Sequence, residues 1–270
     1  MSRAAVLGSP IEHSLSPVLH RAAYAALGLD WTYDAIECGE DDLAELLGQT
    51  WVGLSLTMPL KRAVLPLLDD VSELAGAVGG ANTVVFKDGR RLGFNTDVHG
   101  MVAALGEAGV RTPDSAVVLG AGATACSALA ALRELGLPKV VVVARDPGRA
   151  GEAVAAASRL GVGVTVRGFA DPFPGTDLVI STLPAGVADA HAATIARAAG
   201  ALLDVVYAPW PTEAAEAVRA AGGTTVDGYA MLLHQAARQV AFMTGQDEVP
   251  VEAMRTAGLA EIARRASGNP

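Results

Sequence analysis

The chain has 270 residues, a formal net charge of −9 at pH 7 and an apolar fraction of 51%. Its length suits one large α/β domain or two smaller ones. The acidic charge is dispersed, which disfavours non-specific nucleic-acid binding, and no apolar run approaches the roughly 18 residues that a membrane span needs. The two cysteines, Cys38 and Cys126, lie far apart in the sequence. We therefore expect a cytoplasmic protein that binds neither nucleic acid nor membrane.

The first elements alternate between strands and helices. The pattern predicts strands over residues 3–7, 31–37 and 52–56, a helix that ends near Gly28 and a helix over 40–47. Ser16 precedes Pro17, so we predict that Ser16 is the N-cap of the first helix. Capping does not explain Ser14. Two hydroxyls at a helix N-terminus also favour an anion such as a carboxylate, so a structural and a ligand-binding interpretation both stand.

Polar residues follow the strand at 52–56. Thr57 comes directly after it, Pro59 is expected to start a helix, and Lys61 lies one turn on. Lys61 is either a solvated surface residue or a ligand contact at the carboxyl end of the sheet. Further along we expect a helix over 72–78, a hairpin that turns at Asp-Gly and a helix over 97–105. Asn82 and Asn95 read as turn residues and Asp97 as a first-turn helix acid.

A turn-rich connection at residues 109–115 marks the expected boundary to a second domain. From Ala116 the chain shows regular strand–helix alternation, with strands predicted over 116–119, 139–144, 162–166, 178–181, 201–206 and 224–226. This alternation predicts a doubly wound parallel sheet with helices between the strands. Two helices, over 229–244 and 251–266, are expected to end the chain.

A glycine-rich turn follows the first strand of this second half. Gly120, Gly122 and Ala125 fit the spacing G-x-G-x-x-A between a buried strand and an alanine-rich helix. Such a turn lets the backbone approach a pyrophosphate and points a helix N-terminus at it, so we predict dinucleotide binding. The alternative is a glycine-rich turn that binds nothing.

The end of the next strand bears on which dinucleotide binds. Arg145 follows the strand, as in a site for the 2′-phosphate of NADP, whereas an acid at this point favours NAD. Asp146 complicates the choice, but Asp146 before Pro147 also has the form of a helix N-cap. We take Arg145 as the phosphate contact, so the sequence favours NADP without establishing it. No metal-ligand cluster is visible.

Six ordered motifs resemble those of the shikimate dehydrogenase family, and the resemblance covers nearly the whole chain. They are Gly8-Ser-Pro-Ile-Glu-His-Ser-Leu-Ser-Pro17 with His20, Leu54-Ser-Leu-Thr-Met-Pro-Leu-Lys61, Gly79-Gly-Ala-Asn-Thr83, Gly93-Phe-Asn-Thr-Asp97, Asp204-Val-Val-Tyr-Ala-Pro209 and Gly228-Tyr-Ala-Met-Leu-Leu-His-Gln-Ala236. The resemblance implies reversible, NADPH-dependent reduction of 3-dehydroshikimate to shikimate in aromatic amino-acid biosynthesis. It implies a monomer or homodimer whose partner is this small-molecule substrate.

The resemblance also assigns roles to individual residues. Lys61 would be the acid/base beside the reacting carbonyl, with Asp97 as its partner. The residues implied to bind the substrate are Ser14, Ser16, Thr57, Lys61, Asn82, Asp97, Tyr207 and Gln235. The residues implied to bind the cofactor are Glu73, Gly120, Ala121, Gly122, Ala123, Thr124, Ala144, Arg145, Val205, Gly228 and Met231.

Three departures from the family pattern bear on these roles. Ser55 stands where the family usually has asparagine, so an amide contact to substrate is either missing or replaced by a hydroxyl. Ala123 replaces a glycine, which is tolerable unless a positive φ is needed there. Residues 144–146 replace the usual Asn-Arg-Thr, which weakens the preference for NADP over NAD.

The expected fold is an N-terminal α/β substrate domain and a Rossmann-like NADP-binding domain, with the C-terminal helices packing back on the first. The boundaries would be 1–108 and 229–270 for the discontinuous substrate domain and 109–228 for the Rossmann domain, with a cleft between the two lobes. Two alternatives stay open. One is an NAD-dependent quinate/shikimate dehydrogenase of catabolism, and the other is a non-enzymatic nucleotide sensor on the same fold.

Overall fold

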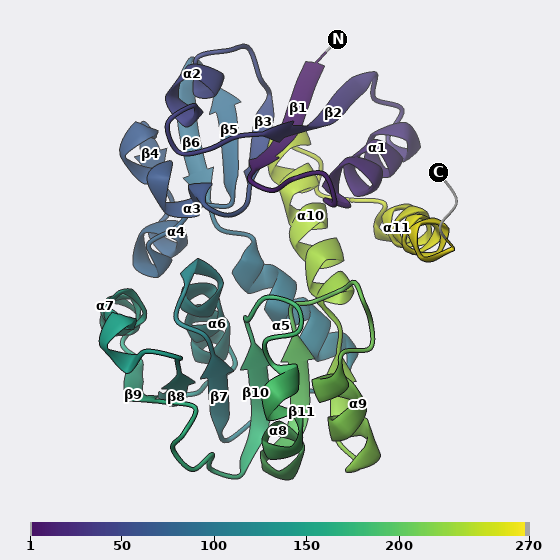
Figure 1. Cartoon of the computed structure of the whole chain (residues 1–270). Helices are drawn as coiled ribbons and strands as arrows, with labels where there is room; N and C mark the ends of the chain where they lie inside the picture. The colour runs from purple at the N-terminus through teal and green to yellow at the C-terminus, as the bar shows by residue number, and fades with distance from the viewer. Residues whose placement is uncertain (1, 268–270) are drawn as a thin grey trace. The chain divides into compact units, whose positions relative to one another are not determined.

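The structure is a computed structural model that describes residues 2–267 (Figure 1). The chain forms two compact units, one comprising Met1–Thr96 and Leu233–Pro270 and the other Asp97–Leu232. These limits differ from the predicted boundaries because helix α5 (Asp97–Glu107) packs against α6 (Ala123–Glu134) of the second unit. The assignment of substrate binding to the first predicted domain and of NADP binding to the second stays a prediction.

The first unit is built on a six-stranded mixed sheet with the strand order β2-β1-β3-β5-β6-β4. β2, β1 and β3 run parallel, and β5 is antiparallel to both β3 and β6. Its elements are β1 (Ser2–Gly8), α1 (Ser16–Ala26), β2 (Trp31–Glu37), α2 (Leu43–Leu47), β3 (Gly53–Leu56), α3 (Leu60–Ala63), a 3₁₀ helix (Leu65–Leu67), β4 (Asp70–Val71), α4 (Glu73–Val78), β5 (Thr83–Lys87), β6 (Arg90–Phe94), most of α10 (Gly228–Thr244) and α11 (Val251–Ala266).

Local sequence explains the predicted hairpin. Asp88 and Gly89, which join β5 to β6, both have positive φ, 51° and 74°. A two-residue turn of this kind needs positive φ at both positions, which Asp-Gly tolerates well. One face of the sheet is covered by a core cluster that includes Leu54 and Leu56 of β3 with Leu43 of α2. The predicted return of the C-terminal helices is confirmed, because α11 packs against α1 (Figure 1).

The start of α1 differs from the prediction. The N-cap residue is Leu15, whose carbonyl oxygen accepts from the Leu19 amide at 3.1 Å, and Ser16 is already helical. The Ser14 hydroxyl, not that of Ser16, accepts a backbone hydrogen bond here, from the Ser16 amide at 3.3 Å. The Leu15 side chain is only 1% exposed, and burying it starts the helix one residue earlier. The prediction that Ser16 is the N-cap is therefore wrong.

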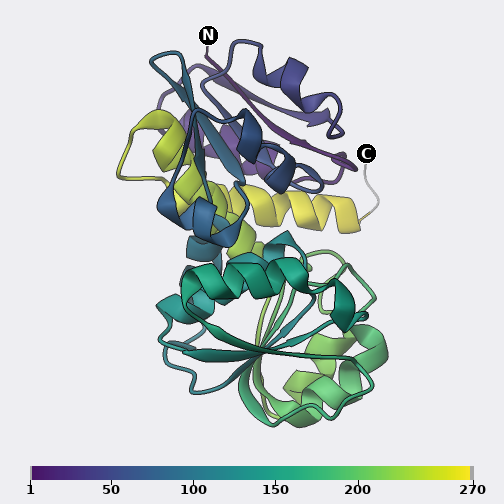
Figure 2. The ribbon, with the colours of Figure 1, turned by 90° about the vertical axis from the view of Figure 1, so that its left-hand side faces the viewer.

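The second unit is a six-stranded, wholly parallel sheet with the order β12-β11-β10-β7-β8-β9, which confirms the predicted doubly wound fold. Figure 2 shows helices on both sides of this twisted sheet. Its elements are α5, β7 (Ala116–Leu119), α6, β8 (Lys139–Val143), a 3₁₀ helix (Pro147–Arg149), α7 (Gly151–Leu160), β9 (Gly163–Arg167), β10 (Thr176–Ser181), a 3₁₀ helix (Asp189–His191), α8 (Ala192–Ala198), β11 (Ala199–Asp204), α9 (Glu213–Ala220), β12 (Thr224–Val226) and the first turn of α10.

The strand order of the second unit indicates where a ligand would bind. After β7 the chain builds β8 and β9 on one side and then returns to place β10 on the other side of β7. In open parallel sheets, ligands bind outside the carboxyl ends of the strands at this reversal. The predicted glycine turn lies directly after β7, at that point. Within residues 2–267, no helix is long and apolar enough to cross a membrane.

Candidate functional site

The first glycine of the predicted nucleotide turn is required by its surroundings. Gly120 has a φ of +105°, and a Cβ built there would lie 2.4 Å from the Thr182 hydroxyl oxygen. That hydroxyl donates to the Leu119 carbonyl oxygen at 2.7 Å, so it is held in place at the end of β10. A side chain at position 120 would meet both backbone strain and a steric clash.

The second half of the turn leaves room for an anion. Gly122 is exposed, a Cβ there would meet no atom within 4 Å, and no side chain caps the N-terminus of α6. Ala123 does not have a positive φ, so the departure from glycine at this position is tolerated. Ala125 is fully buried, as expected of the small third residue that lets α6 pack on the sheet. Gly120 to Thr124 therefore fit a bound pyrophosphate.

The end of β8 carries the predicted 2′-phosphate contact. Val143 pairs with Leu119 in the sheet, so the residues that follow β8 lie at the same edge as the glycine turn. Ala144 is buried and Arg145 is exposed. The Asp146 carboxylate accepts from the Gly148 amide at 3.0 Å, which confirms its predicted role as a cap. With Asp146 engaged in this way, the guanidinium of Arg145 suits the phosphate of NADP.

The segment after β11 brings two predicted cofactor residues together. The Gly228 amide donates to the Val206 carbonyl oxygen at 3.1 Å, and a Cβ on Gly228 would lie 2.0 Å from the Val205 carbonyl oxygen. Tyr207 lies half-buried in the same segment. Met231 is 7% exposed on α10, a burial that core packing would also produce. Position 228 thus tolerates only glycine.

A residue to which sequence reasoning assigned no role holds this segment. Asp204 is 1% exposed and accepts from the Val206 amide at 3.3 Å and from the Thr212 hydroxyl at 3.0 Å. Burial raises the pKa of the Asp204 carboxyl above its ordinary value. Its bonds span the segment that carries Val205 and Tyr207. The motif beginning at Asp204 was visible in the sequence, but its first residue reads as an ordinary strand-end acid.

In the first unit, the segment between β1 and α1 carries the two predicted carboxylate contacts. Ser14 is half-buried and Ser16 is 5% exposed. Arg265, near the end of α11, donates to the carbonyl oxygens of His13 at 2.7 Å and Ser14 at 3.4 Å. Glu37 accepts from the Ser9 hydroxyl and from the Ile11 amide. The segment is therefore held at both of its ends by side chains from elsewhere in the unit.

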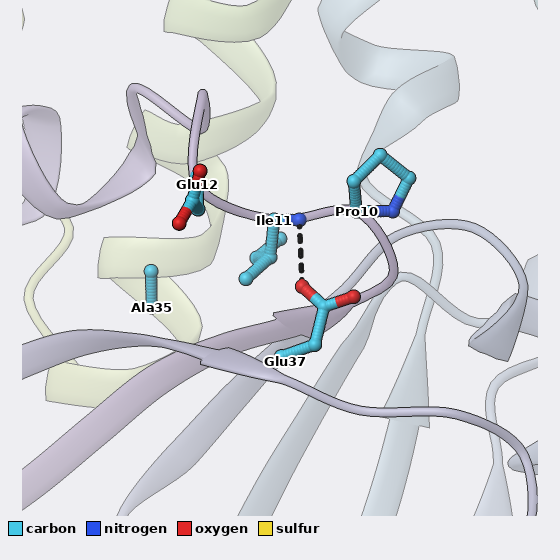
Figure 3. Close-up of a pocket in the computed structure, with 5 residues that line it drawn as sticks. All are labelled: Pro10, Ile11, Glu12, Ala35 and Glu37. Atoms are coloured by element: carbon cyan, nitrogen blue, oxygen red, sulfur yellow. Dashed lines mark hydrogen bonds between the residues drawn. The ribbon is translucent and has the colours of Figure 1, made fainter.

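A surface pocket lies on the outer side of this segment. It is lined by Pro10, Ile11, Glu12, Ala35 and Glu37, and Figure 3 shows the Glu37 carboxylate bonded to the Ile11 amide. None of the predicted site residues lines it. With two carboxylates and no cation in its lining, it does not suit an anionic substrate.

Short elements of the first unit place Thr57, Lys61 and Glu73. The Thr57 amide continues the sheet by donating to the Leu7 carbonyl oxygen at 2.9 Å. Lys61 lies on α3. Its carbonyl oxygen accepts from the Ala81 amide at 2.8 Å, which fixes the backbone of Lys61 beside Ala81, the residue before Asn82. Glu73 is the exposed first residue of α4, as a first-turn acid would be.

The predicted substrate residues Asn82 and Gln235 are in contact. The Asn82 amide nitrogen donates to the Gln235 side-chain oxygen at 3.2 Å and to the Thr96 hydroxyl at 2.9 Å. The Thr96 backbone amide returns a bond to the Asn82 side-chain oxygen at 2.8 Å. Asp97 is the next residue in the chain, 3% exposed, and begins α5 in the second unit. The pairing of Lys61 with Asp97 stays a prediction.

Sequence reasoning missed Gln239, which lies one turn after Gln235 on α10. Its side-chain oxygen accepts from the Ser55 hydroxyl at 2.8 Å, and Ser55 in turn accepts from the Tyr33 hydroxyl at 2.6 Å. Ser55 is 3% exposed, so its hydroxyl is used inside the protein. We expected the family's amide contact to substrate to be either missing or replaced by the Ser55 hydroxyl. The structure favours a missing contact. Within residues 2–267, no group of three or more His, Cys, Asp or Glu could hold a metal ion.

Comparison with known proteins agrees with this arrangement. Two family models match, the shikimate dehydrogenase substrate binding domain over residues 6–84 and the shikimate 5′-dehydrogenase C-terminal domain over residues 228–257. A shikimate dehydrogenase (NADP(+)) from Nostoc sp. is 34% identical over 272 residues, which cover 93% of this chain and 94% of that protein. The chain belongs to the shikimate dehydrogenase family.

Solved structures of the shikimate dehydrogenase family share the whole fold. The Mycobacterium tuberculosis enzyme matches with a TM-score of 0.88 and 44% identity, covering 96% of this chain and 100% of that one. The Thermus thermophilus enzyme in complex with NADP(H) and shikimate matches with a TM-score of 0.85 and 34% identity, covering 96% and 99%. Both matches extend over the two units, so the fold of this chain is that of the family.

Proposed function

We propose that the protein catalyses the reversible, NADPH-dependent reduction of 3-dehydroshikimate to shikimate, a step of aromatic amino-acid biosynthesis. The observation that carries the proposal is the contact between Asn82 and Gln235. These residues are far apart in the sequence, both match family motifs for substrate, and their side chains meet at 3.2 Å. A nucleotide sensor without activity would not need this pair together with Lys61.

The first unit supplies most of the proposed substrate contacts. Ser14 and Ser16 suit the substrate carboxylate, because hydroxyls and backbone amides at the N-terminus of α1 favour an anion. Thr57, Asn82 and Gln235 suit the ring hydroxyls, as do Asp97 and Tyr207. Side-chain amides and hydroxyls that both donate and accept match hydroxyl groups, which also do both.

Lys61 is proposed to serve the reacting oxygen. When hydride reaches the carbonyl carbon, negative charge builds on the oxygen, and an ammonium group there stabilises the charge and supplies a proton. The Asp97 carboxylate would orient the ammonium and keep it charged. Lys61 would therefore act as electrostatic stabiliser and proton donor, with Asp97 as its partner.

NADPH, when bound, supplies the hydride. Gly120, Ala121, Gly122, Ala123 and Thr124 would hold its pyrophosphate at the N-terminus of α6. Ala144 and Arg145 would hold the adenosine ribose and its 2′-phosphate. The remaining proposed contacts are Glu73, Val205, Gly228 and Met231, of which Val205 and Gly228 are held against one another.

The test is to follow NADPH formation optically in the direction of shikimate oxidation. Shikimate with NADP should give steady turnover by the purified protein. No turnover with shikimate under conditions in which the protein is folded would overturn the proposal. We further propose that the protein acts in the cytoplasm as a monomer or homodimer, which sedimentation would test.

A further inference from the structure

Gln239 is the centre of a buried hydrogen-bond network in the first unit. Its side chain is 1% exposed, and each polar atom of its amide has two partners. The nitrogen donates to the Asn82 carbonyl oxygen and to the Thr83 hydroxyl, both at 3.0 Å. The oxygen takes the hydrogen bond from Ser55 at 2.8 Å and lies 3.3 Å from the His20 Nε2 atom. The amide is thus fully satisfied without a ligand.

This network reaches the predicted substrate contact Asn82. At one end, the Thr83 hydroxyl that Gln239 holds donates to the Asn82 side-chain oxygen at 2.9 Å, so both the backbone and the side chain of Asn82 are fixed. At the other end, Ser55 accepts from the Tyr33 hydroxyl at 2.6 Å. Gln239 itself is too deeply buried to touch a substrate.

The position of Gln239 on α10 explains why an amide is needed here. Gln235 and Gln239 are four residues apart, so they lie on one face of the helix. Because Gln239 is bonded to Thr83 of β5 and to Ser55 of β3, it fixes the rotation of α10 and hence the direction of Gln235. Ser55 has a hydroxyl and no amide, whereas the family's usual asparagine at position 55 would bring an amide from the strand itself.

We propose that Gln239 is a positioning residue for the substrate site and supplies from α10 the amide that Ser55 lacks. It holds Asn82 and Gln235 in the arrangement that binds the ring hydroxyls. The inference rests on the proposed function, because it concerns the substrate contacts of that reaction. It does not concern the proposed nucleotide contacts.

The test compares Gln239→Met, which keeps the side-chain length and removes the amide, with Gln49→Met, the same change at an exposed glutamine. Gln239→Met should raise the KM for shikimate about tenfold and leave the KM for NADP unchanged, since buried partners lose their hydrogen bonds. Gln49→Met should behave as wild type. A folded Gln239→Met protein with a wild-type KM for shikimate, or with equal rises for both substrates, would overturn the proposal.

Ser55→Ala provides the second variant, because it removes the bonds of Ser55 to Gln239 and to Tyr33 and leaves the Gln239 amide in place. It should raise the KM for shikimate by a smaller factor, and the two effects should be less than additive in the double variant, because both changes remove the bond between Ser55 and Gln239. If Gln239→Met does not fold, an unchanged KM in Ser55→Ala is the contradicting result. A wild-type protein inert with shikimate would instead refute the proposed function.

Discussion

The guanidinium of Arg265 donates to the main-chain carbonyl oxygen of His13 at 2.7 Å, joining the last turn of α11 to the segment before α1. Glu261 accepts from the Arg265 Nε atom at 2.7 Å and fixes the guanidinium. Hydrogen bonds from Arg264 and Arg265 lower the pKa of Glu261 to about 2, so its carboxylate stays charged in any ordinary assay. The C-terminal helix thus holds the backbone beside Ser14.

Arg265→Ala should therefore weaken substrate binding without changing the nucleotide site. We expect the KM for shikimate to rise about fivefold, with the KM for NADP unchanged, because two hydrogen bonds that hold the carboxylate-binding segment are lost. Arg264→Ala is the matched control, since Arg264 also pairs with Glu261. Equal effects of the two substitutions in steady-state kinetics would contradict this role.

Lys61→Ala should abolish most turnover. We expect kcat to fall about 10²- to 10⁴-fold, the range typical of a lost general acid or base, with a modest change in shikimate binding. Asp97→Asn should also lower kcat, because the Lys61 ammonium would lose the charged partner that we propose for it. Steady-state rates with shikimate and direct binding measurements separate the two effects. Turnover in Lys61→Ala that matches wild type would refute its assignment.

Arg145→Ala should reduce the preference for NADP. Loss of a charge-assisted contact to the 2′-phosphate should raise the KM for NADP about 10- to 100-fold and leave the KM for NAD nearly unchanged, since NAD lacks that phosphate. Asp146→Asn serves as the control, because the Asp146 carboxylate caps the 3₁₀ helix through Gly148. An unaltered ratio of the two KM values in Arg145→Ala would show that other residues select the cofactor.

The buried His20 should make stability depend on pH. Its ring is fully buried, stacked on Tyr33 at 4.0 Å between centroids, and burial lowers its pKa from 6.5 to about 3. The unfolded chain takes up a proton below pH 6.5 that the folded protein does not bind until about pH 3, so stability falls as the pH falls through this window. Between pH 8 and pH 5 the expected loss is about 2 kcal/mol in the free energy of unfolding.

Denaturant unfolding at several pH values checks this expectation. The variant His20→Phe keeps a ring to stack on Tyr33 and removes the titratable group. Its free energy of unfolding should be lower throughout, because Tyr24 and Gln239 lose a partner, but it should change less between pH 8 and pH 5. The same pH dependence in wild type and variant would mean that other groups are responsible.

Much of the fold was predictable from sequence because the second unit follows simple rules. Its central strands are mostly buried and appear as continuous apolar runs, such as Val117–Leu119 of β7 and Val140–Val143 of β8. The hairpin was predictable because Asp88 and Gly89 are residues that tolerate positive φ. Local chemistry alone determines these features, so a single sequence reveals them.

The parts that were not predictable depend on contacts between distant segments. Gln239 reads as one polar residue in an amphipathic helix, and its partners Ser55 and Asn82 come from strands far earlier in the chain. Arg265 likewise acts on a carbonyl near the other end of the sequence. At Ser14 and Ser16, the capping preference was overridden by burial of the neighbouring Leu15. Tertiary packing determines each of these contacts and the start of α1.

The most direct measurement is the kcat/KM of the wild-type protein for shikimate and for quinate, each with NADP and with NAD. We expect shikimate with NADP to give the highest value, and replacing either component should lower it. A highest value with quinate and NAD would identify the catabolic alternative and contradict the proposed function. No turnover in any of the four combinations, by protein shown to be folded, would contradict it more completely.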